Sequence, residues 1–452
     1  MDINKRFNME NLKSIILKAG TGDTGSIPLT SLDCFENRFV FETAVFYKPT
    51  LDPEKLEASL IKTLKAFPIV SGRIKSGPKN KLSINCCDAG VKFTVASCKE
   101  KMEKFGPDNN AKADLDYFLE KIESQTLVDK DTPIASFKIT QMNGGGTVLG
   151  LSMAHGIVDY LSFGYFTMFW ALETKGLSIP GPVLDRTLFE KNMDFDIDED
   201  ELEDEVLGYK YLKPLEIPEI LKNYETYKNQ IVGHVVSFSR TELNNIKNDA
   251  SQGLPEGVWV STNDAFCAYI WQFSSLFRNL DPNSKSKLLL ISDIRSKMIP
   301  ALPLNYFGNA VSNIISEMSV EELQKSPLSK VAYTVRKNVK AINHASIEKE
   351  IKWLRSRVIQ GRMQQVITSM NLYKNDLFMS SVIAGAGYKE VDFGAGPPLW
   401  VTIPNIPVPW VVQLTPSSKG DGGIDMHLHI TEESVKKLTS NEWTEKIHKY
   451  QK

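Results

Sequence analysis

One stretch, residues 149–176, constrains the fold of this chain more than any other. It begins as an apolar run that ends near His155, which is typical of a buried strand. From Tyr160 onward, apolar residues return at helical spacing until Gly176, which predicts a helix with a stop signal. Gly156 permits a sharp turn between the two elements. The sequence therefore places a titratable imidazole where a buried strand gives way to a helix.

His155 is suited to act as a base at such a turn. An imidazole has an ordinary pKa near 6.5, and a rigid turn can leave one ring nitrogen free for a substrate. Asp159, four residues on, can cap the following helix or meet a basic partner. An HxxxD match alone is weak, however, and a lone buried histidine is more often a satisfied core residue. The hypothesis of a catalytic base therefore depends on the rest of the chain.

Length and composition limit the class of protein. A chain of 452 residues predicts two domains of roughly 200 residues each. The 53 basic and 55 acidic residues nearly balance, so no basic field indicates nucleic acid as a partner. No apolar run approaches the roughly 20 residues needed to cross a bilayer, so we expect no membrane span.

The cysteines and the N-terminus indicate the compartment. Five cysteines without a CxxC pair predict reduced thiols, and neither a disulfide framework nor a zinc site. The first residues carry no apolar segment typical of a secretory signal. A cytoplasmic protein is expected. The five cysteines are Cys34, Cys86, Cys87, Cys98 and Cys267.

Local signals give an alternation of helices and strands. Asp52 and Pro53 predict a helix start, with Leu56, Leu60, Leu64 and Phe67 on its buried face. Strands are predicted at 135–142 and 147–153, joined by a hairpin. Further helices are predicted at 241–250, 261–277, 328–344 and 348–370, with strands at 234–238, 287–291, 377–383, 400–403 and 424–430. This mixture predicts an α/β fold with large mixed sheets.

The domain boundaries follow from a change in composition. Residues 177–230 are rich in proline and charge, and residues 194–205 contain nine carboxylates. Such a run is typical of a solvated loop. We therefore predict an N-terminal domain at 1–176, a crossover at 177–230 and a C-terminal domain at 231–452. Part of 371–400 is expected to pack back on the N-terminal domain.

Several familiar sites are excluded or disfavoured. The chain has no G-x-S-x-G, P-loop or H-E-x-x-H motif. The glycines of residues 20–25 fit G-x-G-x-x-G, but no helix is predicted to open there, so a loop is favoured over a dinucleotide site. Asp425, His427 and His429 share one face of a predicted strand. A metal site there is conceivable, but alternation alone produces this pattern, and we interpret it as a solvated face.

Three motifs, taken together, indicate a function. They are His155–Asp159 (HGIVD), residues 293–295 (DIR) followed by residues 300–309 (PALPLNYFGN), and residues 392–397 (DFGAGP). In this order and spread over the chain, they resemble the BAHD family of acyl-CoA-dependent acyltransferases. Further similarities are Ser71-Gly72-Arg73, Leu184-Asp185-Arg186 and Asp421-Gly422-Gly423-Ile424.

The resemblance implies a fold and a reaction. The fold would consist of two chloramphenicol-acetyltransferase-like domains of mixed sheets and helices, joined by a long crossover loop. A channel would run between them, with the acyl-CoA co-substrate and a small-molecule alcohol or amine acceptor entering from opposite sides. His155 would be the general base in the middle of the channel. No permanently bound cofactor and no metal are implied, and we expect a monomer of specialised metabolism.

The resemblance also assigns structural roles. Asp159 is expected to point away from the channel and to fix the loop. Asp392, in the motif with Gly394 and Gly396, is expected to pair with Arg295. The residues that bind the co-substrate are not indicated.

The sequence departs from the family pattern at three positions. Tyr160 replaces a glycine and becomes a candidate for the acceptor pocket. Ala395 and Val382 replace tryptophans, which leaves open the group that stabilises the oxyanion. The alternatives are a non-catalytic acyl-CoA or metabolite-binding protein of the same fold, and a relative that uses another activated acyl donor. Condensation domains, which carry HHxxxDG, are disfavoured because Ala154 precedes His155 and Tyr160 follows Asp159.

Overall fold

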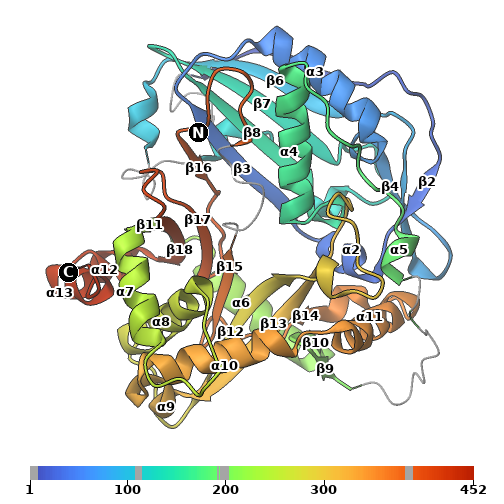
Figure 1. The fold of residues 1–452 in the computed structure, drawn as a ribbon. Helices are drawn as coiled ribbons and strands as arrows, with labels where there is room; N and C mark the ends of the chain where they lie inside the picture. Colours follow the sequence, from blue (N-terminus) through green and yellow to red (C-terminus); the bar gives the residue numbers. More distant parts are fainter. Residues whose placement is uncertain (1–8, 107–114, 191–192, 194–202, 382–389, 452) are drawn as a thin grey trace.

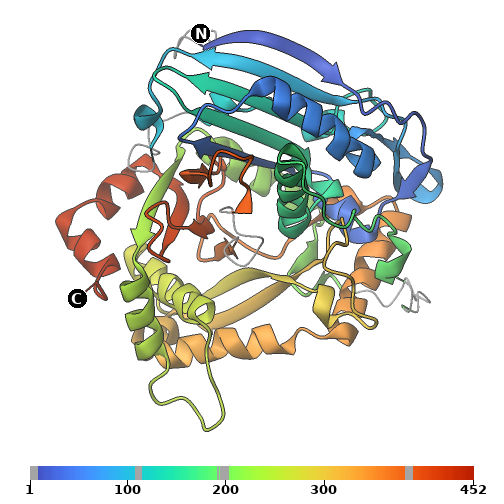
Figure 2. The ribbon, with the colours of Figure 1, turned by 45° about the horizontal axis from the view of Figure 1, so that its top comes forward.

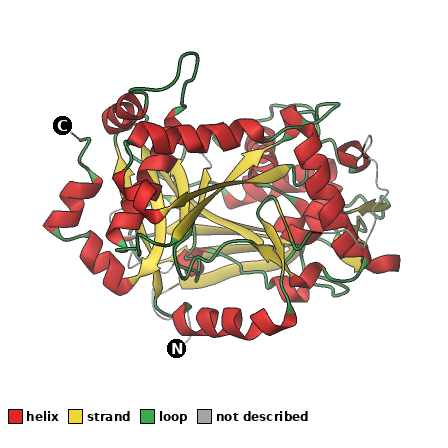
Figure 3. Cartoon of the chain, turned by 90° about the horizontal axis from the view of Figure 1, so that it is seen from below, coloured by secondary structure: helices red, strands yellow, loops and turns green. Residues whose placement is uncertain are grey.

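Two six-stranded sheets form the framework of the described chain (Figure 1). The structure is a computed structural model that describes residues 9–106, 115–190, 193, 203–381 and 390–451. Viewed from below, the strands lie inside the molecule and helices surround them (Figure 3). The α/β class predicted from the sequence is confirmed.

The N-terminal sheet has the strand order β1-β6-β7-β8-β3-β16. All its neighbouring strands are antiparallel except β6 and β7. Helices α3 (Pro53–Ala66) and α4 (Tyr160–Thr174) lie together over one face and share its apolar core (Figure 2). The strands are β1 (Met9–Leu17), β3 (Val40–Tyr47), β6 (Val91–Cys98), β7 (Ala135–Met142), β8 (Thr147–Ala154) and β16 (Trp400–Thr402).

Helix α3 forms where its local signals predict. The Asp52 side chain accepts hydrogen bonds from the backbone N–H groups of Glu54 and Lys55, and Pro53 occupies the first turn. The predicted apolar face is fully buried: Leu56, Leu60, Leu64 and Phe67. Burial of such side chains contributes roughly 1.5–3 kcal/mol each, so the amphipathic face fixes the helix on the sheet.

The C-terminal sheet has the strand order β11-β18-β17-β15-β12-β13. Its helical layer contains α7 (Arg240–Ala250), α8 (Thr262–Phe277) and α10 (Leu328–Ala341), which share one apolar core with the sheet. The strands are β11 (Ile231–Phe238), β12 (Lys285–Asp293), β13 (Val311–Ser319), β15 (Leu377–Ser381), β17 (Val411–Pro416) and β18 (Ile424–Thr431). The C-terminal half also contains α9 (Val320–Lys325), α11 (His344–Ile359), α12 (Glu432–Leu438) and α13 (Asn441–Ile447).

The predicted crossover contains regular elements of its own. They are α5 (Thr187–Glu190), β9 (Glu205–Val206), β10 (Tyr209–Tyr211) and α6 (Ile217–Tyr227). A small sheet joins β9 and β10 to β14 (Val366–Thr368), and a second one joins β2 (Ser26–Pro28), β5 (Leu82–Asn85) and β4 (Arg73–Ser76). Most of the acidic run, residues 194–202, lies outside the described residues.

One predicted helix is too long. The helix predicted at 348–370 ends at Ile359, because Gly361 takes a φ of +68° and the chain then extends into β14. That strand pairs with β10 of the crossover. A pairing between segments so far apart in sequence overrides the local helical pattern.

The two halves of the chain exchange segments. Strand β16, from the C-terminal half, extends the N-terminal sheet by pairing with β3. Val391 and Phe393, within the 371–400 segment, lie in the N-terminal core. Helix α2 (Ser31–Glu36) in turn packs against α11. The boundaries at residues 176 and 230 stay predictions.

In the part of the chain that the structure describes, no helix is both long and apolar enough to cross a membrane. All five cysteines lie among these residues, and none of them forms a disulfide.

Candidate active site

The turn that carries His155 connects β8 to α4. Strand β8 ends at Ala154, a short 3₁₀ turn spans His155–Ile157, and α4 begins at Tyr160. The His155 backbone N–H donates to the Phe39 carbonyl at 3.0 Å. Gly156 is required sterically, since a Cβ there would lie 2.7 Å from Oδ1 of Asn37. The turn is therefore held from both sides, and the His155 side chain keeps 23% of its surface exposed.

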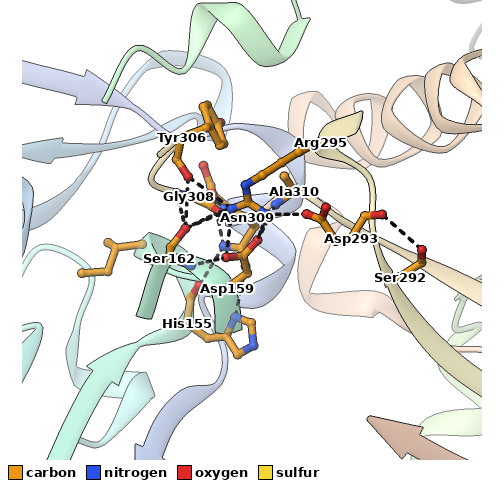
Figure 4. Close-up of polar contacts among 12 residues, drawn as sticks. His155, Asp159, Ser162, Ser292, Asp293, Arg295, Tyr306, Gly308, Asn309 and Ala310 are labelled. Atoms are coloured by element: carbon orange, nitrogen blue, oxygen red, sulfur yellow. Dashed lines mark hydrogen bonds and ion pairs between the residues drawn. The ribbon is translucent and has the colours of Figure 1, made fainter. Parts of the chain in front are cut away.

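Asn309 fixes the orientation of the His155 ring. Its Nδ2 donates to the His155 carbonyl at 2.7 Å and to Oδ1 of Asp33 at 2.9 Å. The amide oxygen therefore faces the ring, where it lies 3.2 Å from Nδ1 of His155 (Figure 4). An amide oxygen accepts and never donates, so Nδ1 carries the hydrogen. Nε2 keeps its lone pair, as a base requires.

Asn309 is itself anchored by a buried ion pair. Asp33 also accepts from the Asn309 backbone N–H at 3.1 Å. Its other carboxylate oxygen lies 3.0 Å from Nε of Arg186, and both side chains are almost fully buried. Arg186 packs so closely under Gly308 that a Cβ there would lie 2.1 Å from the guanidinium. The chain from Arg186 to His155 is thus rigid.

A second buried ion pair holds Asp159 away from the ring. Oδ2 of Asp159 lies 2.8 Å from Nη1 of Arg295, and Oδ1 accepts from the backbone N–H of Ser162 at 2.8 Å. Nη1 of Arg295 also contacts Asp293 at 2.6 Å. Its Nη2 donates to the carbonyls of Tyr306 and Gly308. Figure 4 shows the His155 ring pointing away from this cluster.

The predicted pairing of Arg295 with Asp392 is wrong. Arg295 is occupied by Asp159 and Asp293, whereas Asp392 lies 3.4 Å from Nζ of Lys175. The prediction failed because opposite charges in two motifs do not specify which pairs meet. Asp392 instead belongs to a turn near the end of α4.

The DFGAGP motif forms a tight turn around Asp392. Oδ1 of Asp392 accepts from the backbone N–H groups of Gly394, Ala395 and Gly396 at 2.8–3.0 Å. Both glycines take positive φ, +95° and +103°, which explains their spacing. Partial burial would raise the pKa of the Asp392 carboxyl. The backbone hydrogen bonds and the Lys175 ammonium outweigh it and lower that pKa.

Tyr160 and His155 both contact the ring of Phe41. The Phe41 ring centroid is 5.8 Å from that of His155 and 6.1 Å from that of Tyr160. Burial raises the pKa of Tyr160 to about 12, so the side chain is a neutral phenol at physiological pH. Val382, the other position of interest for the oxyanion, lies outside the described residues.

Glu36 is a further acidic neighbour of His155. It ends α2, and its Oε2 lies 3.7 Å from Nδ1 of His155. Burial raises the pKa of the Glu36 carboxyl, although His155 and Arg38 act in the opposite direction.

Sequence reasoning gave no role to Asp33, Glu36, Arg186 or Asn309. Two of these lie in stretches that carry the family resemblance: Arg186 follows Leu184-Asp185, and Asn309 follows the DIR motif. The resemblance could therefore have pointed to Arg186 and Asn309. Asp33 and Glu36 lie on a short helix without any motif, and only the folded chain brings them to His155.

The strand face with Asp425, His427 and His429 is not solvated as predicted. All three side chains are at least 96% buried. His429 Nδ1 lies near Asn405 and accepts from the backbone N–H of Ile406, and His427 contacts Thr415. Burial lowers the pKa of His427 to about 4 and that of His429 to about 3, so both rings are neutral. Within the described residues, no group of three or more His, Cys, Asp or Glu side chains could hold a metal ion.

Comparison with known proteins identifies the family. The Transferase family profile matches residues 11–445. The chain is 24% identical over 409 residues to agmatine coumaroyltransferase-1 from Hordeum vulgare, covering 89% of this chain and 90% of that protein. It is 23% identical over 422 residues to shikimate O-hydroxycinnamoyltransferase from Nicotiana tabacum, covering 90% and 92%.

A solved structure shares the fold. The crystal structure of F. graminearum TRI101 complexed with coenzyme A and deoxynivalenol superposes with a TM-score of 0.74 at 17% identity, over 93% of this chain and 98% of that one. The chain therefore belongs to the Transferase family, the BAHD acyltransferases, and is an enzyme that moves an acyl group from acyl-CoA to a hydroxyl or amine acceptor.

Proposed function

We propose that His155 is the general base of this acyltransferase and that transfer is direct, from acyl-CoA to the acceptor. The observation that carries the proposal is the contact between Nδ1 of His155 and Oδ1 of Asn309. It leaves the Nε2 lone pair free, on a side chain that is partly exposed and rigidly mounted.

The reaction then needs one base and no covalent enzyme intermediate. Nε2 of His155 takes the proton from the acceptor hydroxyl or amine while the oxygen or nitrogen attacks the thioester carbonyl carbon. The tetrahedral intermediate collapses by breaking the C–S bond. The departing CoA thiolate receives the proton from the imidazolium, which restores the neutral ring. Such catalysis contributes roughly 10²–10⁴ in rate, and holding both substrates together contributes more.

The acceptor is a small molecule with an amine or hydroxyl group. The name of the barley relative gives an amine acceptor, and that of the tobacco relative gives an O-acylation. We assign two side chains to the acceptor pocket: Phe41, whose ring contacts His155, and Tyr160, whose ring contacts Phe41. We further propose that the enzyme acts in the cytoplasm as a monomer.

The test is a screen of acyl-CoA donors against pooled amine and hydroxyl acceptors, with release of free CoA measured by a thiol reagent. His155→Ala should lower kcat/KM by at least roughly 10² while acyl-CoA binding and the melting temperature stay near wild type. His234→Ala, which changes a histidine on β11, is the matched control.

Retention of more than about a tenth of wild-type kcat/KM by His155→Ala would contradict the general-base role. Binding of acyl-CoA by the wild type without turnover of any acceptor would favour a ligand-binding protein of the same fold.

A further inference from the structure

Glu36 is a buried carboxylate next to the base, and the mechanism above does not use it. Its side chain is 13% exposed, and its Oε2 lies 3.7 Å from Nδ1 of His155. The Nδ1–H is closer to Oδ1 of Asn309, at 3.2 Å. Asn309 therefore takes the hydrogen bond of Nδ1, and Glu36 lies close enough to the ring for its charge to act on it.

The other carboxylates around Glu36 are matched by arginines. Asp33, on the same helix, pairs with Arg186 at 3.0 Å. Asp159, at the start of α4, pairs with Arg295 at 2.8 Å. Burial is the largest effect that raises the pKa of the Glu36 carboxyl, whereas His155 and Arg38 lower it. Asp33 and Asp159 add a smaller increase. Arg186 and Arg295 limit the effect of these two carboxylates, since each ion pair is close to neutral when seen from Glu36.

The remaining titratable neighbours of Glu36 are neutral or engaged elsewhere. Burial raises the pKa of Glu350, on α11, to about 8, so this group is mostly protonated at pH 7. Burial also raises the pKa of Tyr209, on β10, which stays a neutral phenol. Arg38 favours the Glu36 anion, but its guanidinium donates to three backbone carbonyls. Within the described residues, the one ion-pair partner of Glu36 closer than 4 Å is His155.

We propose that Glu36 is a positioning residue whose carboxylate stabilises the imidazolium form of His155 during acyl transfer. This inference rests on the proposed role of His155. When Nε2 takes the acceptor proton, the ring becomes a cation between Asn309 and Glu36. No proton moves to Glu36. The two charges attract each other more strongly here than they would in water, because the turn is partly buried and water screens them less.

The proposal predicts a shift in the pH profile. A negative charge beside Nδ1 favours the protonated form of the ring over the neutral form. Glu36→Gln removes that charge and should move the acid limb of the kcat/KM profile about one pH unit lower. The same variant should lower kcat at pH 8 roughly tenfold. The ring would bind the acceptor proton less tightly by about one pKa unit, and one such unit corresponds to a factor of ten.

The experiment compares kcat/KM from pH 5 to 9 for the wild type, Glu36→Gln, Glu36→Asp and Glu42→Gln. Glu36→Asp keeps the charge and should leave the limb near the wild-type position. Glu42→Gln is the matched control, because Glu42 is a half-buried carboxylate on β3 with Ser152 as its hydrogen-bond partner. Its limb should coincide with that of the wild type. If Glu36→Gln does not fold, Glu36→Met removes the same charge, and the same shift is expected.

The protonation of the ring is followed separately by NMR titration of ¹³C-labelled histidine, with the His155 signal assigned from His155→Ala. The expected result is a shift of this titration to lower pH in Glu36→Gln. An unshifted titration and an unshifted limb would overturn the inference, even if the rate falls. If the wild type transfers no acyl group, the proposed function fails, and the NMR titration alone decides the inference.

Discussion

Asp159 and Arg295 lie 136 residues apart in the sequence and form an ion pair of 2.8 Å, with side chains 2% and 1% exposed. Asp159 also caps α4, immediately after the turn that carries His155. The pair therefore ties the turn that carries His155 to the start of the segment that carries Asn309.

Removal of one partner of this pair should destabilise the whole protein. Arg295→Ala or Asp159→Ala leaves an uncompensated buried charge, which costs on the order of 3–5 kcal/mol. Urea unfolding measures the loss. Lys325→Ala, which breaks the exposed pair with Glu321, is the control and should leave the midpoint unchanged. A stable Arg295→Ala protein without activity would contradict the structural role.

Asn309→Ala should lower kcat more than it changes either KM, because the ring loses the group that fixes its orientation. We expect a loss of more than about tenfold, below the roughly 10²–10⁴ attributed to the base itself. Steady-state kinetics measure both parameters. Asn305→Ala, in the same segment but on an exposed loop, is the control. Equal kcat values for the two variants would contradict the role of Asn309 in orienting the His155 ring.

Asp392→Asn should show a pH-dependent loss of stability. The folded-state pKa of Asp392 is depressed, so its charge contributes stability above the unfolded pKa of about 3.9. That contribution is lost as pH falls through the folded pKa. The variant should therefore be less stable at pH 7, by up to about 1 kcal/mol, and the difference should shrink as pH falls below about 3.9. Unfolding curves at pH 7 and at a series of lower pH values test this, and a constant difference would refute it.

Glu350→Gln should flatten the dependence of stability on pH. The folded-state pKa of Glu350 is raised to about 8, so the folded protein holds a proton that the unfolded chain releases above about 4.3. Wild-type stability should therefore fall from pH 5 to 8, by up to about 1.4 kcal/mol per pH unit from this one group. The variant lacks this slope. Identical slopes in urea unfolding at pH 5, 6.5 and 8 would show that Glu350 is ionised in the folded state.

Tyr160→Gly should change the ranking of acceptors. If the phenol narrows the pocket beside the base, its removal should shift relative kcat/KM values by roughly 1–3 kcal/mol in favour of larger acceptors. The KM for acyl-CoA should move little. Tyr165→Gly, at a position on the same helix, controls for loss of helix propensity. An unchanged ranking at matched thermal stability would make Tyr160 a packing residue.

Features encoded by neighbouring residues could be predicted from the sequence. The cap at Asp52, the hairpin before β8 and the turn at His155 each depend on a few adjacent side chains, and the structure has them where predicted. Asp159 as a helix cap belongs to the same class, because the capping oxygen reaches an N–H three residues away.

Features that depend on distant contacts could not be predicted. Alternation placed His427 and His429 on one strand face, but it does not say which face the rest of the chain covers. The partner of Arg295 had to be chosen among several carboxylates, and the three-dimensional path of the chain decides that choice. Glu36 and Asp33 reach His155 only because α2 packs against the turn at His155–Ile157.

The edge strand β16 has a consequence for engineering this enzyme. Its three residues pair with β3, and the Trp400 ring stacks on Phe46 at 4.7 Å. An N-terminal half produced alone would leave β3 with an open edge and an uncovered aromatic ring, which invites aggregation. The halves are therefore not interchangeable modules. A chimera that replaces residues 231–452 also replaces β16, the edge strand of the N-terminal sheet. The new C-terminal half must therefore supply a strand that pairs with β3 and a side chain that packs on Phe46.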